Sequence, residues 1–481
     1  MKFKLTFFTS GMLLIMMGMV MLIPCAMDYV DGNDNAGAFF EAALFSIFTG
    51  GCLFFANQGG LENFNIREGF LLTTVSWLLL SVVGALPFYF SDLGVSFADA
   101  CFESFSGITT TGSTVFSGLD FMSRGILLWR SMLQWIGGIG IIAFGIVLLP
   151  FLKIGGMQLF QTESSDRSDK LLPQSRQLVG RLVFVYVLLS FLCFVSYYAL
   201  GMTVFDAINH AMTTLSTGGY STHDSSFGYF QSSSMKLVCA FFMFCGGVPF
   251  VLFIKYIFLG QFTFHKDEQV KGFLAIIIVF STMIMFWMIF NKDTSLSDDF
   301  VLALFNVISV LTTTGYGTVD YAQWGPFMGI LFFFMTYIGG CAGSTSGGLK
   351  VMRLQVVLQG AKKQINRLLY PNGVFNPSYQ GRVLDNELVT TIMAFMSLYV
   401  LLNVFLTLAL AFVGLDMETA FSGAATAIAN VGPGIGGVIG PAGNFSSLPD
   451  AAKWLLCLGM FLGRLEILTV FVILTPYYWK N

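Results

Sequence analysis

Four short segments rich in small and hydroxyl-bearing residues carry the most specific pattern in this chain. They read CFESFSGITTTGST (101–114), INHAMTTLSTGGYS (208–221), LFNVISVLTTTGYG (304–317) and FSGAATAIANVGPG (421–434). When Gly112, Gly219, Gly315 and Gly432 are aligned, an alanine stands twelve residues before each glycine, at positions 100, 207, 303 and 420. Four copies in one register, about 100 residues apart, predict an internal structural repeat.

The residues just before each aligned glycine are suited to binding a dehydrated monovalent cation. Glycine permits backbone angles that let successive carbonyl oxygens point the same way, and a ring of carbonyls replaces the water shell of potassium. The residues directly before the glycines, 109–111, 216–217, 312–314 and 429–431, include no carboxylate, the ligand that Ca²⁺ and Mg²⁺ prefer. We therefore predict K⁺ as the transported and bound metal ion, with this filter: Thr110, Thr111, Gly112, Thr217, Gly218, Gly219, Thr313, Thr314, Gly315, Asn430, Val431 and Gly432.

Each filter segment needs a half-helix in front of it. The roughly ten residues before each glycine are apolar or small, which is too short a stretch to cross a bilayer. Non-helical backbone at membrane depth is tolerated only where protein or a water-filled path encloses it. The carboxyl end of a half-helix carries partial negative charge, so four such ends around one axis favour a cation.

The remaining sequence supplies membrane spans around these segments. Only 11% of the residues are charged and 55% are hydrophobic, whereas soluble domains carry about 25% charged residues. Apolar runs long or nearly long enough to span recur at 5–23, 38–55, 70–90, 126–152, 182–200, 237–258, 273–290, 325–338, 388–413 and 454–474. The first run is longer than a signal-peptide core and is expected to be a retained helix, and the run at 325–338 to be interrupted.

The order of these pieces predicts an all-α polytopic membrane protein. About ten transmembrane helices are expected in all: an N-terminal helix pair, followed by four pseudo-symmetric repeats of span, pore loop and span around one pore. The expected divisions are 1–66 for the helix pair, then 67–160, 161–263, 264–372 and 373–481 for the four repeats. Lys and Arg gather in alternate connections, which predicts that both termini are cytoplasmic and that the filter segments open outward below acidic connections.

Two further features are candidates for a gate. Segment 339–348 holds five glycines inside the second span of repeat three, at roughly 1 kcal/mol each in a helix, so the helix is expected to break there. We predict that Gly343, Ser344, Thr345 and Ser346 form an obstructing intramembrane loop; a simple kink or close helix crossing is the alternative. Arg464 lies inside the last apolar run, where an arginine is costly and normally faces a cavity or a partner. Pairing with Glu466 or contact with half-helix carbonyls is the alternative to a role in the gate.

Other polar residues have simpler interpretations. We expect Glu103 and His210 to be buried behind the filter, and Arg124, Arg130 and Lys236 to be anchors at the membrane surface. The eight cysteines show no paired spacing and are expected to be packing residues. The basic segment 350–367 is either ordinary cytoplasmic charge or a docking site for a partner.

The sequence lacks the signatures of several other function classes. It has no G-x-x-x-x-G-K-[ST] motif for ATP and no grouped base and nucleophile, so we expect no enzyme activity, no bound cofactor and no nucleic-acid partner. The four repeats run in one direction, unlike the inverted repeats of many secondary transporters. A potassium symporter coupled to H⁺ or Na⁺ remains the alternative to a gated pore.

Taken with the loops, GGCAGSTSGGLK (339–350) and GRLE (463–466) resemble the Trk/Ktr/HKT superfamily of potassium transporters over essentially the whole chain. The extra N-terminal pair is similar to the TrkH branch. The resemblance implies K⁺ uptake across the bacterial inner membrane, a lipid-embedded homodimer, and a cytosolic TrkA-like nucleotide-binding ring that regulates the gate. It also implies that Arg464 lies near the intramembrane loop and opposes cation entry. Four filter glycines imply a preference for K⁺, but Ser221 stands where repeat three has Gly317, and Pro433 where it has Tyr316, so we expect imperfect discrimination.

Overall fold

The computed structural model describes residues 3–58, 66–148, 171–291, 296–376 and 378–480, and in these ranges the chain is almost entirely helical. The N-terminal pair is α1 (Lys4–Val30) and α2 (Asn35–Ala56). Repeat one comprises α3 (Ile66–Gly84), α4 (Leu86–Phe90), α5 (Phe97–Ile108), η1 (Leu119–Phe121), α6 (Arg124–Ala143) and η2 (Phe144–Leu148). Repeat two comprises α8 (Leu171–Ala199), α9 (Val204–Leu215), η5 (Ser226–Tyr229), α10 (Ser233–Gly247) and α11 (Phe250–Leu259).

The second half of the chain repeats this order. Repeat three comprises η6 (Phe264–Lys266), α12 (Glu268–Asn291), α13 (Leu296–Leu311), η7 (Tyr321–Trp324), α14 (Pro326–Thr336) and α15 (Val351–Leu369). A short antiparallel hairpin, β1 (Ser378–Tyr379) with β2 (Arg382–Val383), leads into repeat four. That repeat comprises α16 (Asn386–Phe412), α17 (Met417–Ala429), α18 (Asp450–Arg464), α19 (Leu468–Leu474) and α20 (Pro476–Trp479).

The expected spans are present, but two of them are sharply bent. In the described part of the chain, seven helical segments are long and apolar enough to cross a membrane, and α14 is a shorter apolar helix. The runs at 237–258 and 454–474, which the sequence predicts as continuous, bend by 93° between α10 and α11 and by 108° between α18 and α19. The first bend lies at Val248 and Pro249, because proline lacks the amide hydrogen that a helix needs. At the second bend Glu466 adopts a φ of +59°.

The four half-helices are α5, α9, α13 and α17. The aligned alanines that the sequence singles out are fully buried in all four, which explains why a small residue recurs there. Ser96 begins α5 and Thr203 begins α9, each accepting a hydrogen bond from an aspartate amide three residues on and donating its hydroxyl to the same aspartate. These reciprocal contacts fix where the half-helices start.

The N-terminal pair is fastened to the first repeat through buried polar contacts. Asp28 of α1 is fully buried, and its carboxylate accepts hydrogen bonds from Gly125 N at 2.7 Å and Ser123 Oγ at 3.1 Å. An acidic side chain at a helix start complements the partial positive charge there. Asp28 therefore holds the first turn of α6 in place.

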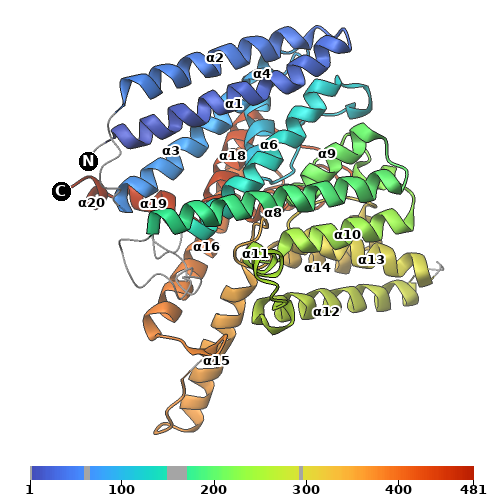
Figure 1. The fold of residues 1–481 in the computed structure, drawn as a ribbon. Coiled ribbons are helices and arrows are strands. Elements are labelled where there is room, and N and C mark those ends of the chain that lie inside the picture. The colour runs from blue at the N-terminus through green and yellow to red at the C-terminus, as the bar shows by residue number, and fades with distance from the viewer. Residues whose placement is uncertain (1–2, 59–65, 149–170, 292–295, 377, 481) are drawn as a thin grey trace.

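Figure 1 shows both chain ends at the same side of the molecule, with α1 and α2 lying together over one face. The Phe3 ring stacks on Trp479, and Tyr478 donates to the carbonyl oxygen of Arg67. In the same view, α15 extends away from the bundle of spans. Its outer part exposes Leu358, Ile365, Leu368 and Leu369 beside Lys362, Lys363 and Arg367.

Candidate functional site

The four glycine-containing segments form a closed ring in which each one contacts the next. A side-chain carbon added at Gly112 would overlap the carbonyl oxygen of Gly218, one at Gly219 that of Thr314, and one at Gly315 that of Val431. The ring closes at Gly432, where an added carbon would lie 2.8 Å from the carbonyl oxygen of Thr111. The structure thus brings all twelve sequence-predicted filter residues to one place, in the order of the repeats.

The backbone of the ring repeats as closely as its sequence does. Two residues before each glycine, φ is positive: +51° at Thr110, +51° at Thr217, +57° at Thr313 and +56° at Asn430. Asparagine tolerates this region, but a β-branched threonine there is a true outlier, and such strain of about 1–3 kcal/mol per residue tends to be retained for function. The aligned glycines are also left-handed, at +86°, +77°, +78° and +109°.

The candidate gate loop, residues 339–350, lies at the carboxyl ends of the half-helices. Thr345 Oγ1 donates to the carbonyl oxygen of Leu215, the last residue of α9, at 3.1 Å. Gly347 N donates to Thr313 Oγ1 at 2.7 Å, and Gly348 N to the carbonyl oxygen of Ala429, the last residue of α17, at 2.8 Å. The loop therefore uses two carbonyl oxygens at the half-helix ends and one ring hydroxyl as hydrogen-bond acceptors, on the side of the ring where the half-helices end.

Arg464 lies beside this loop. It ends α18 at the sharp bend, not halfway along a continuous span as the sequence suggests, and is only 3% exposed. None of its three guanidinium nitrogens has a hydrogen-bond partner among the described residues. Gly343, Ser344, Ser346 and Arg464 line one small cavity; Thr345 is buried in the same loop.

Glu466 pairs with a different arginine than the alternative sequence interpretation proposes. Its carboxylate lies 2.6 Å from Nη2 of Arg353, in the first turn of α15. Arg353 is also stacked over the Phe395 ring at 3.9 Å. This buried pair ties the root of the protruding helix α15 to the bend after Arg464.

Similarity to a known protein family covers the part of the chain that forms this site. The family model described as TrkH, cation transport protein, matches residues 36–479. The chain belongs to the TrkH family.

Its relatives are named as potassium uptake proteins rather than enzymes. The chain is 45% identical to the Trk system potassium uptake protein TrkI of Halomonas elongata, over 86% of this chain and 84% of that protein. It is 38% identical to TrkH of Vibrio parahaemolyticus over the full length of both. The crystal structure of the potassium transporter TrkH from Vibrio parahaemolyticus superposes with a TM-score of 0.91 at 35% identity, covering 100% of each chain.

In this TrkH-family chain, polar side chains outside the ring bond to three of its four loops and brace them. Nine residues before the aligned glycine, Glu103, His210 and Asn306 each bond the segment just after it: Glu103 accepts from Val115 N, His210 Nε2 contacts Ser221 Oγ, and Asn306 Nδ2 donates to Thr318 Oγ1. The fourth copy has Gly423 at this position. Burial of Glu103 and His210 is confirmed. These three positions lie inside the aligned segments, and the signal for the brace is a polar side chain nine residues before the glycine in three of the four copies.

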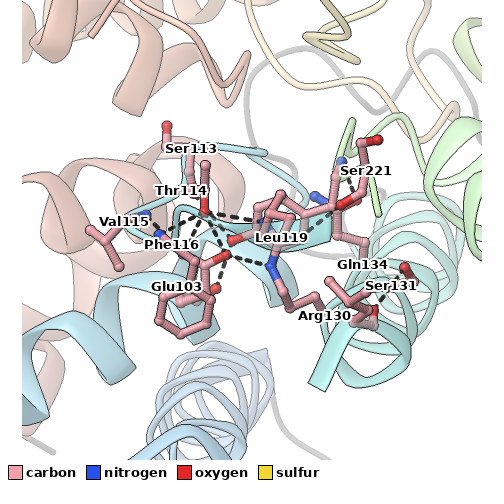
Figure 2. Close-up of polar contacts among 12 residues, drawn as sticks. Glu103, Ser113, Thr114, Val115, Phe116, Leu119, Arg130, Ser131, Gln134 and Ser221 are labelled. Atoms are coloured by element: carbon pink, nitrogen blue, oxygen red, sulfur yellow. Dashed lines mark hydrogen bonds and ion pairs between the residues drawn. The ribbon is translucent and has the colours of Figure 1, made fainter. Parts of the chain in front are cut away.

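Arg130 corrects the sequence prediction, because it is buried and not a surface anchor. It is 1% exposed, and its Nε donates to Glu103 Oε1 at 2.7 Å. Nη1 donates to the carbonyl oxygen of Ser221 at 2.9 Å, and Nη2 to Thr114 Oγ1 at 3.1 Å. Figure 2 shows these contacts converging between the first and second loops. No sequence signal marked this role, because Arg130 and Glu103 lie on different helices and the distance between them is set by how those helices pack.

Replacing Arg130 by glutamine is expected to cost about 3–5 kcal/mol of folding free energy, because it leaves the Glu103 carboxylate buried without its partner. Thermal stability of the purified protein measures this. The double variant Glu103→Gln/Arg130→Gln is expected to recover much of the loss. Arg124→Gln, on the same helix but exposed and paired with Asp31, is the matched control; equal effects of R130Q and R124Q would contradict the assignment.

The opposite side of the ring opens into a mouth with acidic residues. One cavity is lined by all four aligned glycines together with Arg130, His223 and Asp224. His223 Nδ1 lies 2.5 Å from Asp120, and its ring stacks on Tyr229. Burial lowers the pKa of His223, but hydrogen bonds and charge from Asp206 and Asp120 outweigh this and hold the pKa above its usual value. Among the described residues there is no group of three or more His, Cys, Asp or Glu side chains arranged to hold a metal.

Proposed function

We propose that this chain takes up K⁺ across the bacterial inner membrane through a selectivity filter formed by its four loops. The observation that supports this most strongly is the closed ring, in which each aligned glycine abuts a backbone carbonyl of the next loop. Carbonyl rings suit a dehydrated monovalent cation. The transporter names of the relatives in this family agree with that chemistry.

In this proposal, the ion is held by backbone oxygens and threonine hydroxyls of the twelve filter residues. The buried Thr110 Oγ1 and Asn430 Oδ1 have no hydrogen-bond partner among the described residues, so they are available to an ion at the base of the ring. Glu103 and Arg130 act as positioning residues, because they contact the loops through side chains while lying outside the ring.

The gate in this proposal combines the intramembrane loop with Arg464. The loop donates to Leu215, Thr313 and Ala429, so passage of a cation requires it to move. A buried positive charge beside the same path opposes a cation electrostatically. The residues assigned to the gate are Gly343, Ser344, Thr345, Ser346 and Arg464.

The assembly proposed around this pore follows the family. Two chains form a homodimer in the lipid bilayer, both termini face the cytoplasm, and the repeats divide near residues 66, 160, 263 and 372. A cytosolic TrkA-like nucleotide-binding ring docks on the same side. Helix α15 fits the docking role because it extends from the bundle with exposed basic and apolar residues.

The test is uptake of ⁸⁶Rb⁺ into liposomes that contain the purified chain alone, under an imposed diffusion potential. We expect electrogenic uptake that K⁺ competes strongly, Na⁺ less and Li⁺ poorly. The liposome reports passive flow, since no regulator or energy source is present.

A different outcome would change the class of transporter. Uptake that requires an imposed H⁺ or Na⁺ gradient would replace the gated pore by an ion-coupled potassium symporter. Equal competition by K⁺, Na⁺ and Li⁺ would reject the filter residues as the basis of selectivity.

A further inference from the structure

The cavity beside the gate loop is unusually rich in hydrogen-bond donors without partners. Besides Arg464, it is lined by Ser346 of the loop and Tyr399 of α16. The Ser346 hydroxyl, the Tyr399 hydroxyl and all three Arg464 nitrogens are buried and have no hydrogen-bond partner among the described residues. These side chains come from three separate elements and are each at most 4% exposed.

The charges around the cavity are predominantly positive. Lys350, Arg353 and Arg464 line it, against Glu466 as the one acidic lining residue. The Glu466 carboxylate already accepts from Arg353 at 2.6 Å, and Lys350 Nζ donates to the carbonyl oxygen of Ser346. Uncompensated buried cations are costly, by several kcal/mol per ion, and the basic lining residues outnumber the acidic one, so this site favours an additional negative charge.

The size of the cavity restricts what could supply that charge. Its volume is about 30 Å³, while one water molecule needs roughly 10–15 Å³ on the same scale. A space of this size suits a halide-sized ion better than sulfate, phosphate or a bulky carboxylate such as gluconate. A halide also accepts hydrogen bonds from several directions, as the guanidinium and two hydroxyls require.

We propose that a chloride-sized monovalent anion binds between Arg464, Ser346 and Tyr399. Such an ion joins the loop to α16 and α18 and so stabilises the arrangement in which the loop lies across the half-helix ends. This consequence rests on the proposed gate, because it assumes that the loop obstructs the pore. With the anion bound, the loop supplies the obstruction, and the Arg464 charge opposes a cation when the anion has left. The binding site itself rests on the donors, the charges and the volume.

The test is equilibrium binding of ³⁶Cl⁻ to the purified full-length chain in detergent, with potassium constant. We expect saturable binding that bromide displaces and gluconate does not. Arg464→Gln is expected to weaken binding about tenfold or more, since a charged donor is lost. Tyr399→Phe removes one hydroxyl without changing charge and is expected to weaken binding less, which keeps the test decisive if R464Q folds poorly.

Arg124→Gln is the matched control, because Arg124 is exposed and paired with Asp31 far from the loop in sequence, and it should bind chloride as the unchanged protein does. Absence of saturable binding in the unchanged protein would overturn the proposal. Equal binding by R464Q, Y399F and the unchanged protein would overturn it too, because the anion would then sit elsewhere. Neither result touches the filter or gate, which ⁸⁶Rb⁺ flux tests separately.

Discussion

Gly219→Ser is expected to reduce selective uptake strongly. An added side-chain carbon would overlap the carbonyl oxygen of Thr314 in the next loop, and a non-glycine residue at a φ of +77° adds strain of about 1–3 kcal/mol. The Thr314 carbonyl must therefore turn away from the axis. We expect ⁸⁶Rb⁺ uptake to fall by about tenfold or more, since about 1.4 kcal/mol corresponds to tenfold, and the preference for K⁺ over Na⁺ to fall with it.

Gly432→Ser provides the graded comparison. Its added carbon would lie 2.8 Å from the Thr111 carbonyl oxygen, whereas the other three ring glycines give direct overlap. We therefore expect Gly432→Ser to retain more uptake and selectivity than Gly219→Ser. Equal loss in the two variants would mean that crowding between neighbouring loops does not set the effect, and unchanged selectivity in both would remove the glycines from the filter.

Arg464→Ala is expected to raise basal ⁸⁶Rb⁺ flux. At an effective dielectric constant of about 20, a unit charge opposes a cation by about 4 kcal/mol at about 4 Å, and the energy falls in inverse proportion to distance. We therefore expect flux to rise by about tenfold or more. Arg464→Lys keeps the charge and should stay near the basal level. Unchanged or reduced flux in R464A, with the protein still monodisperse, would reject Arg464 as part of the gate.

The loop contacts allow an independent check of the same gate. Thr345→Val removes the hydroxyl that donates to Leu215 and Gly246, so it is expected to raise basal flux by several-fold through loss of about 1 kcal/mol. Thr336→Val is a matched control, because the Thr336 hydroxyl donates only within its own helix, to Phe332. A similar rise in T336V would show that the effect is not specific to the loop.

The sequence was sufficient for the features that depend on local pattern. The alignment of Gly112 with Gly219, Gly315 and Gly432 placed the ring residues correctly, because a repeated register must fold into a repeated backbone. The glycines of segment 339–348 predicted the helix break, and α14 does end at Thr336 before it. Length and hydropathy located the spans.

The sequence was insufficient where a contact joins distant segments. Arg130 looked like a membrane-surface anchor because its partner Glu103 lies in another helix, and only the packing of α5 on α6 brings them together. Glu466 accepts a hydrogen bond from Arg353, which lies 113 positions away in the sequence. The bend after Arg464 depends on the φ of Glu466, which no helix propensity predicts, because tertiary contacts override local preference there.

The ring described above also constrains how the protein is made. Its last contact joins Gly432 to Thr111, so residues 321 positions apart in the sequence must meet. Chains are synthesised from the N-terminus, and domains that are already complete fold first. Here the first three loops are synthesised before the fourth, so the ring cannot close until the fourth loop has been made. The first three loops must therefore avoid incorrect contacts until the fourth repeat has been translated. A chain that ends before the fourth repeat cannot form the closed ring.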